Sequence, residues 1–237
     1  MMTTHTDKEF ERELVELRNR LLEMGGLVEA AIANSVRALI EGDTELARQV
    51  KIKDREINRM EVDVDSACRR MLALRQPAAS DLRFITTALK IVTDLERMGD
   101  LAKDVAKRAL ELAKSPQALA LRSMHGLTKL ADLCEAQLKL VLDAFVTRDV
   151  DKADQVLHGD HVLDATYYNI LNSLFALMTE DSHAIRRATA VMFAAKHLER
   201  FGDHAINLAE MVVYMVRGTD IRHPTSRTVG AEKPEPA

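Results

Sequence analysis

The six residues LERMGD at 95–100 return with a single change as LERFGD at 198–203. Both copies lie in stretches whose hydrophobic residues recur with the period of an α-helix. In each copy the glycine costs about 1 kcal/mol of helix propensity relative to alanine. The glutamate and the last aspartate are four residues apart, which places two like charges one helical turn from each other. The recurrence of this unfavourable combination indicates a duplicated unit whose two copies need the same arrangement.

The composition is typical of a helical protein. The 237 residues are 47% hydrophobic and 4% aromatic, with no tryptophan, nine glycines and five prolines. A β-sandwich would need more turn residues. A net charge of −4 provides no basic face for nucleic acid, so nucleic acid is not an expected partner.

Two further features favour a cytoplasmic protein. Cys68 and Cys134 lie far apart in apolar helical patterns, as buried thiols in a reducing compartment do. The N-terminal residues are too charged for a signal peptide, and no run reaches the roughly 18 apolar residues of a membrane span. We therefore expect membrane contact to be peripheral.

Hydrophobic periodicity predicts three long helices in the first half of the chain, over 8–40, 44–74 and 81–114. Gly42-Asp43 and Gln76-Pro77 separate them, and Ser80 is the expected N-cap of the third. Helices of this length joined by short turns fit an antiparallel bundle.

The second half of the chain repeats this pattern. EGDTELARQVKIKD (41–54) matches TRDVDKADQVLHGD (147–160) at an offset of 106, and the third helices match at an offset of 103. The prediction is an all-α fold of two tandem homologous three-helix bundles, six long helices in all. The predicted units are 8–114, 117–217 and a disordered tail, 218–237.

Acidic residues form a row beside the apolar stripe of each third helix. In the first copy the row is Glu96, Asp100 and Asp104, and the facing row of the second helix is Asp54, Asn58, Glu61 and Asp65. In the second copy Glu199 and Asp203 face Asp160 and Asp164. Antiparallel helices bring these rows face to face, where the carboxylates must repel, raise their pKa values or bind a cation.

Oxygen ligands alone favour a hard or borderline ion, so Fe, Mn, Mg, Ca and Zn all remain open. The glycine of each motif would allow close approach of another backbone or a ligand. The competing interpretation is a solvated acidic edge, partly neutralised by Arg97 and Arg200.

An enzyme is the other alternative, either an oxidase or a phosphatase with a carboxylate-bridged pair of metals. A di-iron bundle needs two Glu-x-x-His pairs, but the sequence has one, Glu180 with His183. We expect His197 and His204 to lie on the solvated outer face of the last helix. No nucleophile motif is present, so we predict a protein without catalytic residues, and a metal-free adaptor is a third possibility.

The sequence resembles the PhoU family of bacterial phosphate-signalling regulators over residues 8–223. The resemblance is carried by the two tandem bundles, by RQPAASDLR (75–83) at a turn of the first copy, and by the paired LERMGD and LERFGD. It implies a non-enzymatic cytoplasmic regulator, peripheral to the inner membrane, that holds the phosphate-starvation response off. The implied partners are the ATPase component of the phosphate ABC transporter, a sensor histidine kinase and a second copy of the chain.

The resemblance also implies metal sites, because family members carry acidic Glu/Asp-x-x-x-Asp motifs associated with multinuclear metal clusters. On this chain the motifs fall on Glu96/Asp100 and Glu199/Asp203, with Glu61/Asp65 and Asp160/Asp164 as partner rows. Asn207 departs from the pattern, because the first copy has Asp104 there. With one charge fewer, we expect the second site to hold its metal more weakly.

Overall fold

The computed structural model describes residues 3–114 and 121–222, and over these residues the chain is helical without strands. The elements are α1 (Thr3–Glu41), α2 (Thr44–Leu74), α3 (Ala79–Leu112), α4 (Leu121–Thr147), α5 (Val150–Glu180), a short 3-10 turn (Ser182–Ala184) and α6 (Ile185–Arg217). The predicted all-α fold with six long helices is confirmed. The expected start of the second unit at 117 and residues 223–237 of the expected tail lie outside the described residues.

The turn between the first two helices of each repeat has the same local structure. Gly42 and Arg148 adopt the left-handed conformation, with φ of 71° and 55°. The next residue, Asp43 or Asp149, is the N-cap of the following helix, and its Oδ1 accepts hydrogen bonds from two backbone N–H groups of the first turn. These bonds satisfy donors that a helix start leaves free. The two turns that the offset of 106 pairs in the sequence therefore have the same backbone geometry.

The predicted N-cap of α3 is wrong. The helix begins at Ala79, and Ala78 occupies the cap position without a side-chain hydrogen bond. Pro77 disfavours the helical conformation at the residue before it but not after it, so the helix starts as soon as the chain leaves the proline. Ser80 lies already inside the first turn, beside Asp81, whose charge favours a helix N-terminus.

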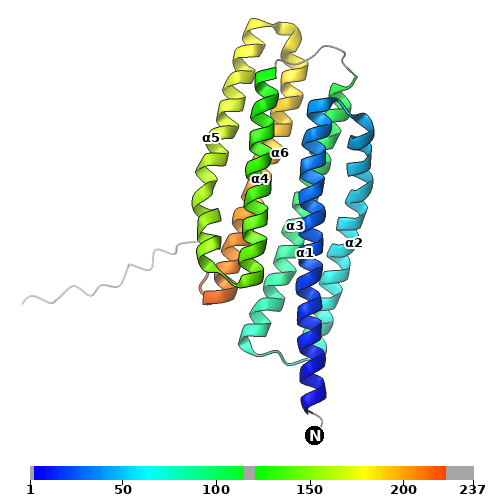
Figure 1. Cartoon of the computed structure of the whole chain (residues 1–237), viewed down its shortest axis with the longest axis vertical. Coiled ribbons are helices and arrows are strands. Elements are labelled where there is room, and N and C mark those ends of the chain that lie inside the picture. The colour runs from blue at the N-terminus through cyan, green and yellow to red at the C-terminus, as the bar shows by residue number, and fades with distance from the viewer. Residues whose placement is uncertain (1–2, 115–120, 223–237) are drawn as a thin grey trace, which may run out of the picture.

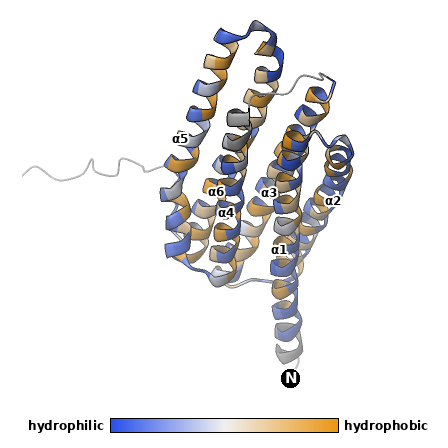
Figure 2. Cartoon of the chain, turned by 45° about the horizontal axis from the view of Figure 1, so that its top comes forward, coloured by the Kyte–Doolittle hydropathy of each residue, from blue (hydrophilic) through white to orange (hydrophobic). Residues whose placement is uncertain are grey.

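Each repeat is a three-helix bundle, and the two bundles stand side by side (Figure 1). The repeats meet through α3 with α6 and through α1 with α4, whereas α2 and α5 contact helices of their own repeat over the described residues. Figure 2 shows hydrophobic and hydrophilic residues alternating along the helices, as expected for faces turned toward and away from a core. No helix in the described part of the chain has a stretch apolar enough to cross a membrane.

Helices α3 and α6 run antiparallel. At one end Arg83 Nε donates to the Met215 carbonyl at 3.3 Å, and at the other the Arg108 guanidinium lies 5.6 Å from the ring centre of Phe193. Midway between these contacts lie Met98 and Phe201, both fully buried. Met98 and Phe201 occupy the one position at which the two motifs differ, so the motifs cross near the middle of the two helices.

Candidate metal centre

The structure brings the two predicted acidic rows of the first repeat together. The side chain of Glu96 is 16% exposed. Burial raises the pKa of Glu96, and the neighbouring carboxylate of Asp100 adds to the increase, as do Glu61 and Asp54 of α2 to a smaller extent. Carboxylates of α2 and α3 thus act on one group, so these rows face each other as expected from the antiparallel turn.

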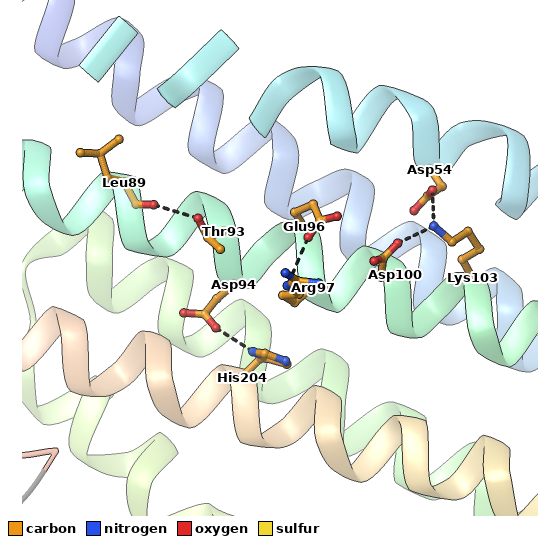
Figure 3. A network of polar contacts seen from close by, with 9 residues as sticks. All are labelled: Asp54, Leu89, Thr93, Asp94, Glu96, Arg97, Asp100, Lys103 and His204. Atoms are coloured by element: carbon orange, nitrogen blue, oxygen red, sulfur yellow. Dashed lines mark hydrogen bonds and ion pairs between the residues drawn. The ribbon is translucent and has the colours of Figure 1, made fainter. Parts of the chain in front are cut away.

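A lysine lies between the two rows (Figure 3). The Lys103 ammonium group on α3 donates to Asp54 Oδ2 of α2 at 2.7 Å and also to Asp100 Oδ1. Asp54 is buried, with a side chain that is 7% exposed. Its second oxygen, Oδ1, and Oδ1 of Asn58 have no hydrogen-bond partner. A buried oxygen without a partner is costly, and here two of them lie one turn apart on α2.

Other cations neutralise the edge of this cluster. Lys107 binds Asp104 at 2.6 Å, Arg69 binds Asp65 at 2.9 Å, and Arg97 lies 3.7 Å from Glu96. We call the six carboxylates the first acidic cluster: Asp54, Glu61, Asp65, Glu96, Asp100 and Asp104. Four cationic side chains therefore face six acidic ones.

The second repeat has an equivalent cluster with fewer cations. Burial raises the pKa of Asp160, followed by the charge of Asp164 on the same helix and then by Asp203 and Glu199 on α6. Lys196 binds Glu199, with Nζ 2.6 Å from Oε2. Among the residues of 3–114 and 121–222, no ion pair reaches the other three carboxylates. The second acidic cluster comprises Asp160, Asp164, Glu199 and Asp203, with the half-buried Asn207 one turn further along α6.

The motif glycines allow close packing of helices within each repeat. A Cβ atom on Gly99 would lie 3.1 Å from Ile57 of α2, and one on Gly202 would lie 2.6 Å from Leu163 of α5. A side chain of the neighbouring helix therefore makes the close approach at each glycine, and not the backbone or ligand that was expected. Because α2 and α5 carry the second acidic rows, the glycines set the separation between the facing carboxylates.

The histidines of α6 are not on a solvated face, and the expectation that they would be was wrong. His204 is 20% exposed, and its Nδ1 lies 2.7 Å from Asp94 Oδ1 of α3 (Figure 3). His197 is half-buried, its Nδ1 has no partner, and burial lowers its pKa. The face of α6 that looks outward from its own bundle is the one that packs on α3, which a helical wheel of a single repeat does not reveal.

The donor set of both clusters fits a hard cation, since carboxylate and amide oxygens are the ligands that such ions prefer. The unpartnered Asp54 Oδ1 and Asn58 Oδ1 provide free acceptor oxygens at the first cluster. Over the described residues, however, no three carboxylate, imidazole or thiol groups are arranged so that they could hold one ion. Metal ligation by these residues thus remains a prediction.

The sequence analysis missed one residue of these clusters and underestimated another. Asp54 belongs to the predicted row, but its burial makes it central to the cluster rather than peripheral. Lys103 was not predicted at all. The sequence did hold a signal for it, because the offset of 103 pairs Lys103 with Ile206 and Lys107 with Glu210, and this reveals that the repeats differ in their cations.

Comparison with known proteins defines the class. The family model described as PhoU domain matches residues 21–109 and again 127–212, and the starts and ends of the two matches differ by the same offsets as the repeats. The chain belongs to the PhoU family. Its predicted resemblance to that family and its two-repeat architecture are both confirmed.

Relatives of known name cover nearly the whole chain. A Pseudomonas putida protein named phosphate-specific transport system accessory protein PhoU homolog is 43% identical over 98% of this chain and 90% of the relative. The Escherichia coli K12 protein PhoU, of the same accessory type, is 36% identical over 94% and 91%. These names describe accessory proteins rather than enzymes, which agrees with the prediction of a non-enzymatic protein.

Solved structures show the same fold. The crystal structure of PhoU from Pseudomonas aeruginosa matches with a TM-score of 0.84 at 43% identity. The match covers 89% of this chain and 100% of the Pseudomonas chain. The structure of the phosphate transport system regulatory protein PhoU from Streptococcus pneumoniae has a TM-score of 0.82 at 32% identity, with coverage of 90% and 99%.

Proposed function

We propose that this chain is an accessory protein of the phosphate transport system that holds the phosphate-starvation response off when phosphate is plentiful. The observation that carries the proposal is the match of both repeats, over nearly their full length, to the PhoU domain and to relatives named as accessory proteins of the phosphate-specific transport system. In the proposed mechanism the chain acts by contact. It binds the ATPase component of the phosphate ABC transporter and a sensor histidine kinase, working as a homodimer at the cytoplasmic face of the inner membrane and modulating phosphate uptake.

Metal ions bound by carboxylates form the second part of the proposal, with Fe, Mn, Mg or Zn as candidates. The residues that would hold them are Glu61, Asp65, Glu96, Asp100 and Asp104 in the first repeat and Asp160, Asp164, Glu199, Asp203 and Asn207 in the second. Support comes from the raised pKa values of Glu96 and Asp160, which are caused first by burial and then by the neighbouring and facing carboxylates. A bound cation would supply positive charge that removes this repulsion and fixes α2 on α3 and α5 on α6.

A reporter of the phosphate-starvation response tests the regulatory role. Deleting the gene is expected to switch the reporter on in phosphate-rich medium, and the wild-type gene is expected to silence it again. A reporter that stays silent after deletion would contradict the role. Purification of tagged protein after crosslinking in cells should recover the transporter ATPase and the kinase, and recovery of neither would remove the proposed partners.

Variants separate the metal part from the regulatory part. The double variant Glu199→Gln with Asp203→Asn is expected to lose metal on elemental analysis. The matched control is Glu56→Gln with Asp63→Asn, which removes two charges from exposed carboxylates of α2. If wild-type protein silences the reporter but contains no metal under varied supply, a metal-free adaptor is the better description.

A further inference from the structure

The two acidic clusters have different counter-ions, although their helices follow the same repeat. In the first cluster the Lys103 ammonium group bridges α2 and α3 by contacts to Asp54 and Asp100 (Figure 3). The repeat register pairs Lys103 with Ile206, a partly buried side chain packed against the core. Isoleucine cannot supply a charge, so no ammonium group bridges the helices at the equivalent place in the second cluster.

Lys103 is held firmly as a cation. The ammonium group of Lys103 donates hydrogen bonds to Asp54, at 2.7 Å, and to Asp100, and a lysine is ordinarily a cation at neutral pH. Asp54 is 5% exposed, and a buried carboxylate is stable only with a partner. Lys103 is the partner of Asp54 in this structure, and an entering metal ion must displace it.

The cations at the edge of the clusters are also more numerous in the first cluster than in the second. Arg69, which binds Asp65 in the first cluster, is replaced in the repeat register by Phe175, and Lys107 is replaced by Glu210. The remaining cation of the second cluster is Lys196, which is 47% exposed and binds Glu199 at the rim. Glu199 itself is 15% exposed, and over the described residues the other three carboxylates of the second cluster have no ion pair.

A buried amide lies between the two helices that carry the second cluster. Gln137 of α4 is 9% exposed, and its Oε1 has no hydrogen-bond partner. Its amide lies between α5 and α6, with Nε2 3.8 Å from a Cβ position on Gly159 and Oε1 3.4 Å from one on Gly202. These glycines directly precede Asp160 and Asp203. An acceptor oxygen without a donor therefore lies beside the backbone of α5 and α6 next to these two aspartates.

We propose that Lys103 is a built-in counter-ion of the first acidic cluster, so that an added metal ion binds the second acidic cluster first. The inference rests on the metal part of the proposed function and ranks the two sites within it. The sequence analysis expected weaker metal binding at the second site, because Asn207 stands there in place of Asp104. The inference predicts the opposite order. The second cluster has four carboxylates against six in the first, but it has one cation against four, so it keeps the larger net negative charge. At the first cluster the Lys103 ammonium group also competes with a metal ion for the same oxygens.

Titration with Mn²⁺ tests the order of binding. Full-length protein is freed of metal by a chelator, and bound Mn²⁺ is measured by calorimetry and by the paramagnetic resonance signal of the free ion. The tighter class of sites is expected to disappear in Asp160→Asn with Asp203→Asn and to survive in Asp54→Asn with Asp100→Asn. The opposite pattern, or equal loss in both, overturns the proposal.

Removal of the lysine provides the direct test. Lys103→Met is expected to tighten Mn²⁺ binding at the first cluster at least tenfold and to enlarge the rise in melting temperature that Mn²⁺ causes. Lys107→Met is the matched control, since it removes the same charge from the next turn but from a lysine that is 42% exposed. It is expected to change the affinity less than threefold. Equal responses of the two variants overturn the proposal.

The reverse exchange keeps the test decisive if Lys103→Met does not fold. Ile206→Lys places an ammonium group at the equivalent position of the second cluster, and it is expected to weaken Mn²⁺ binding there at least tenfold, whereas Ile206→Met is not. Unchanged affinity in Ile206→Lys overturns the proposal. Absence of Mn²⁺ binding in every protein overturns it together with the metal part of the proposed function, but leaves the reporter result unaffected.

Discussion

The two repeats share a backbone and differ in how they balance charge. Asp43 and Asp149 cap α2 and α5 in the same way. Yet the first repeat places Lys103 between its acidic rows, and the second places Ile206 there. The difference shows that helix packing and charge compensation are separate requirements. Helix packing is maintained by apolar periodicity and helix caps. Charge compensation is decided by single side chains at the edges of the acidic rows.

The space between the first two helices of each repeat differs as well. Gln137 on α4 has Ala31 as its counterpart on α1. Beside Ala31 the structure has a cavity of about 60 Å³, also lined by Lys53 and Ile57. The first repeat thus leaves open a space that the second fills with an amide.

The largest expected effect concerns the crossing of the two motifs. Phe201→Ala is expected to reduce the free energy of unfolding by about 3–5 kcal/mol and Met98→Ala by about 2–5, with the ring leaving the larger cavity. Both side chains are fully buried, whereas Phe175, 52% exposed, provides the control Phe175→Ala. Urea denaturation measures all three. A loss at Met98 and Phe201 no greater than that at Phe175 would show that the crossing contributes little.

The next prediction concerns the equivalent aspartates of α2 and α5, measured without metal. Asp54→Asn is expected to lower the free energy of unfolding by about 1–3 kcal/mol, because it removes the charged partner of Lys103 from a buried site. Asp160→Asn is expected to raise the melting temperature at pH 7, because it removes a repelling charge. The same sign in both variants would remove the contrast between the repeats.

The pH dependence of that second variant follows from the direction of its pKa shift. The pKa of Asp160 is raised in the folded chain, so the folded state binds its proton more readily than the unfolded state. The destabilising charge is present above the folded pKa and disappears as the pH falls through it. The advantage of Asp160→Asn over wild type in melting temperature should therefore shrink from pH 7 toward about pH 4, near the ordinary pKa of aspartate.

A smaller difference is expected at the motif glycines. Gly202→Ala forces a methyl group against Leu163, which would be 2.6 Å away, whereas Gly99→Ala meets Ile57 at 3.1 Å. Overpacking costs about 1–3 kcal/mol and the gain in helix propensity offsets about 1 kcal/mol. Gly202→Ala should therefore lower the free energy of unfolding by roughly 1–2 kcal/mol more than Gly99→Ala, as denaturant titration can measure. Equal effects would mean that α5 can move away from α6 as easily as α2 from α3.

The smallest predicted effect lies at the first turn of each repeat. Arg148 adopts φ of 55° where the first repeat has a glycine, and side chains other than glycine are disfavoured there. Arg148→Gly is expected to raise the free energy of unfolding by about 0.5–1 kcal/mol, and Gly42→Ala to lower it by about 1 kcal/mol. Thermal unfolding of the two variants should shift in opposite directions, and a shift in one direction only would place the strain elsewhere.

The sequence was sufficient to predict features that depend on local pattern. The period of the apolar residues predicted the helices, and the offsets of 106 and 103 predicted the correspondence that Asp43 and Asp149 show. The facing of Glu96 with α2 followed from the antiparallel turn. Each of these depends on neighbours one helical turn away or on a short connection.

Features that depend on contacts between distant segments were not predicted. His204 contacts Asp94 because α6 packs on α3 of the other repeat, and a helical wheel contains no information on that contact. Lys103 reaches Asp54 across to α2 through a long flexible side chain, so its position on the wheel does not fix its partner. The start of α3 differed because Pro77, rather than the expected cap Ser80, determines where the helix begins.

The antiparallel crossing of α3 and α6 joins the two repeats, whereas each acidic cluster lies within one repeat, between α2 and α3 or between α5 and α6. Figure 1 shows the two bundles side by side, with α3 and α6 between α2 and α5. A substitution that loosens the crossing would therefore let the repeats shift against each other without opening either cluster.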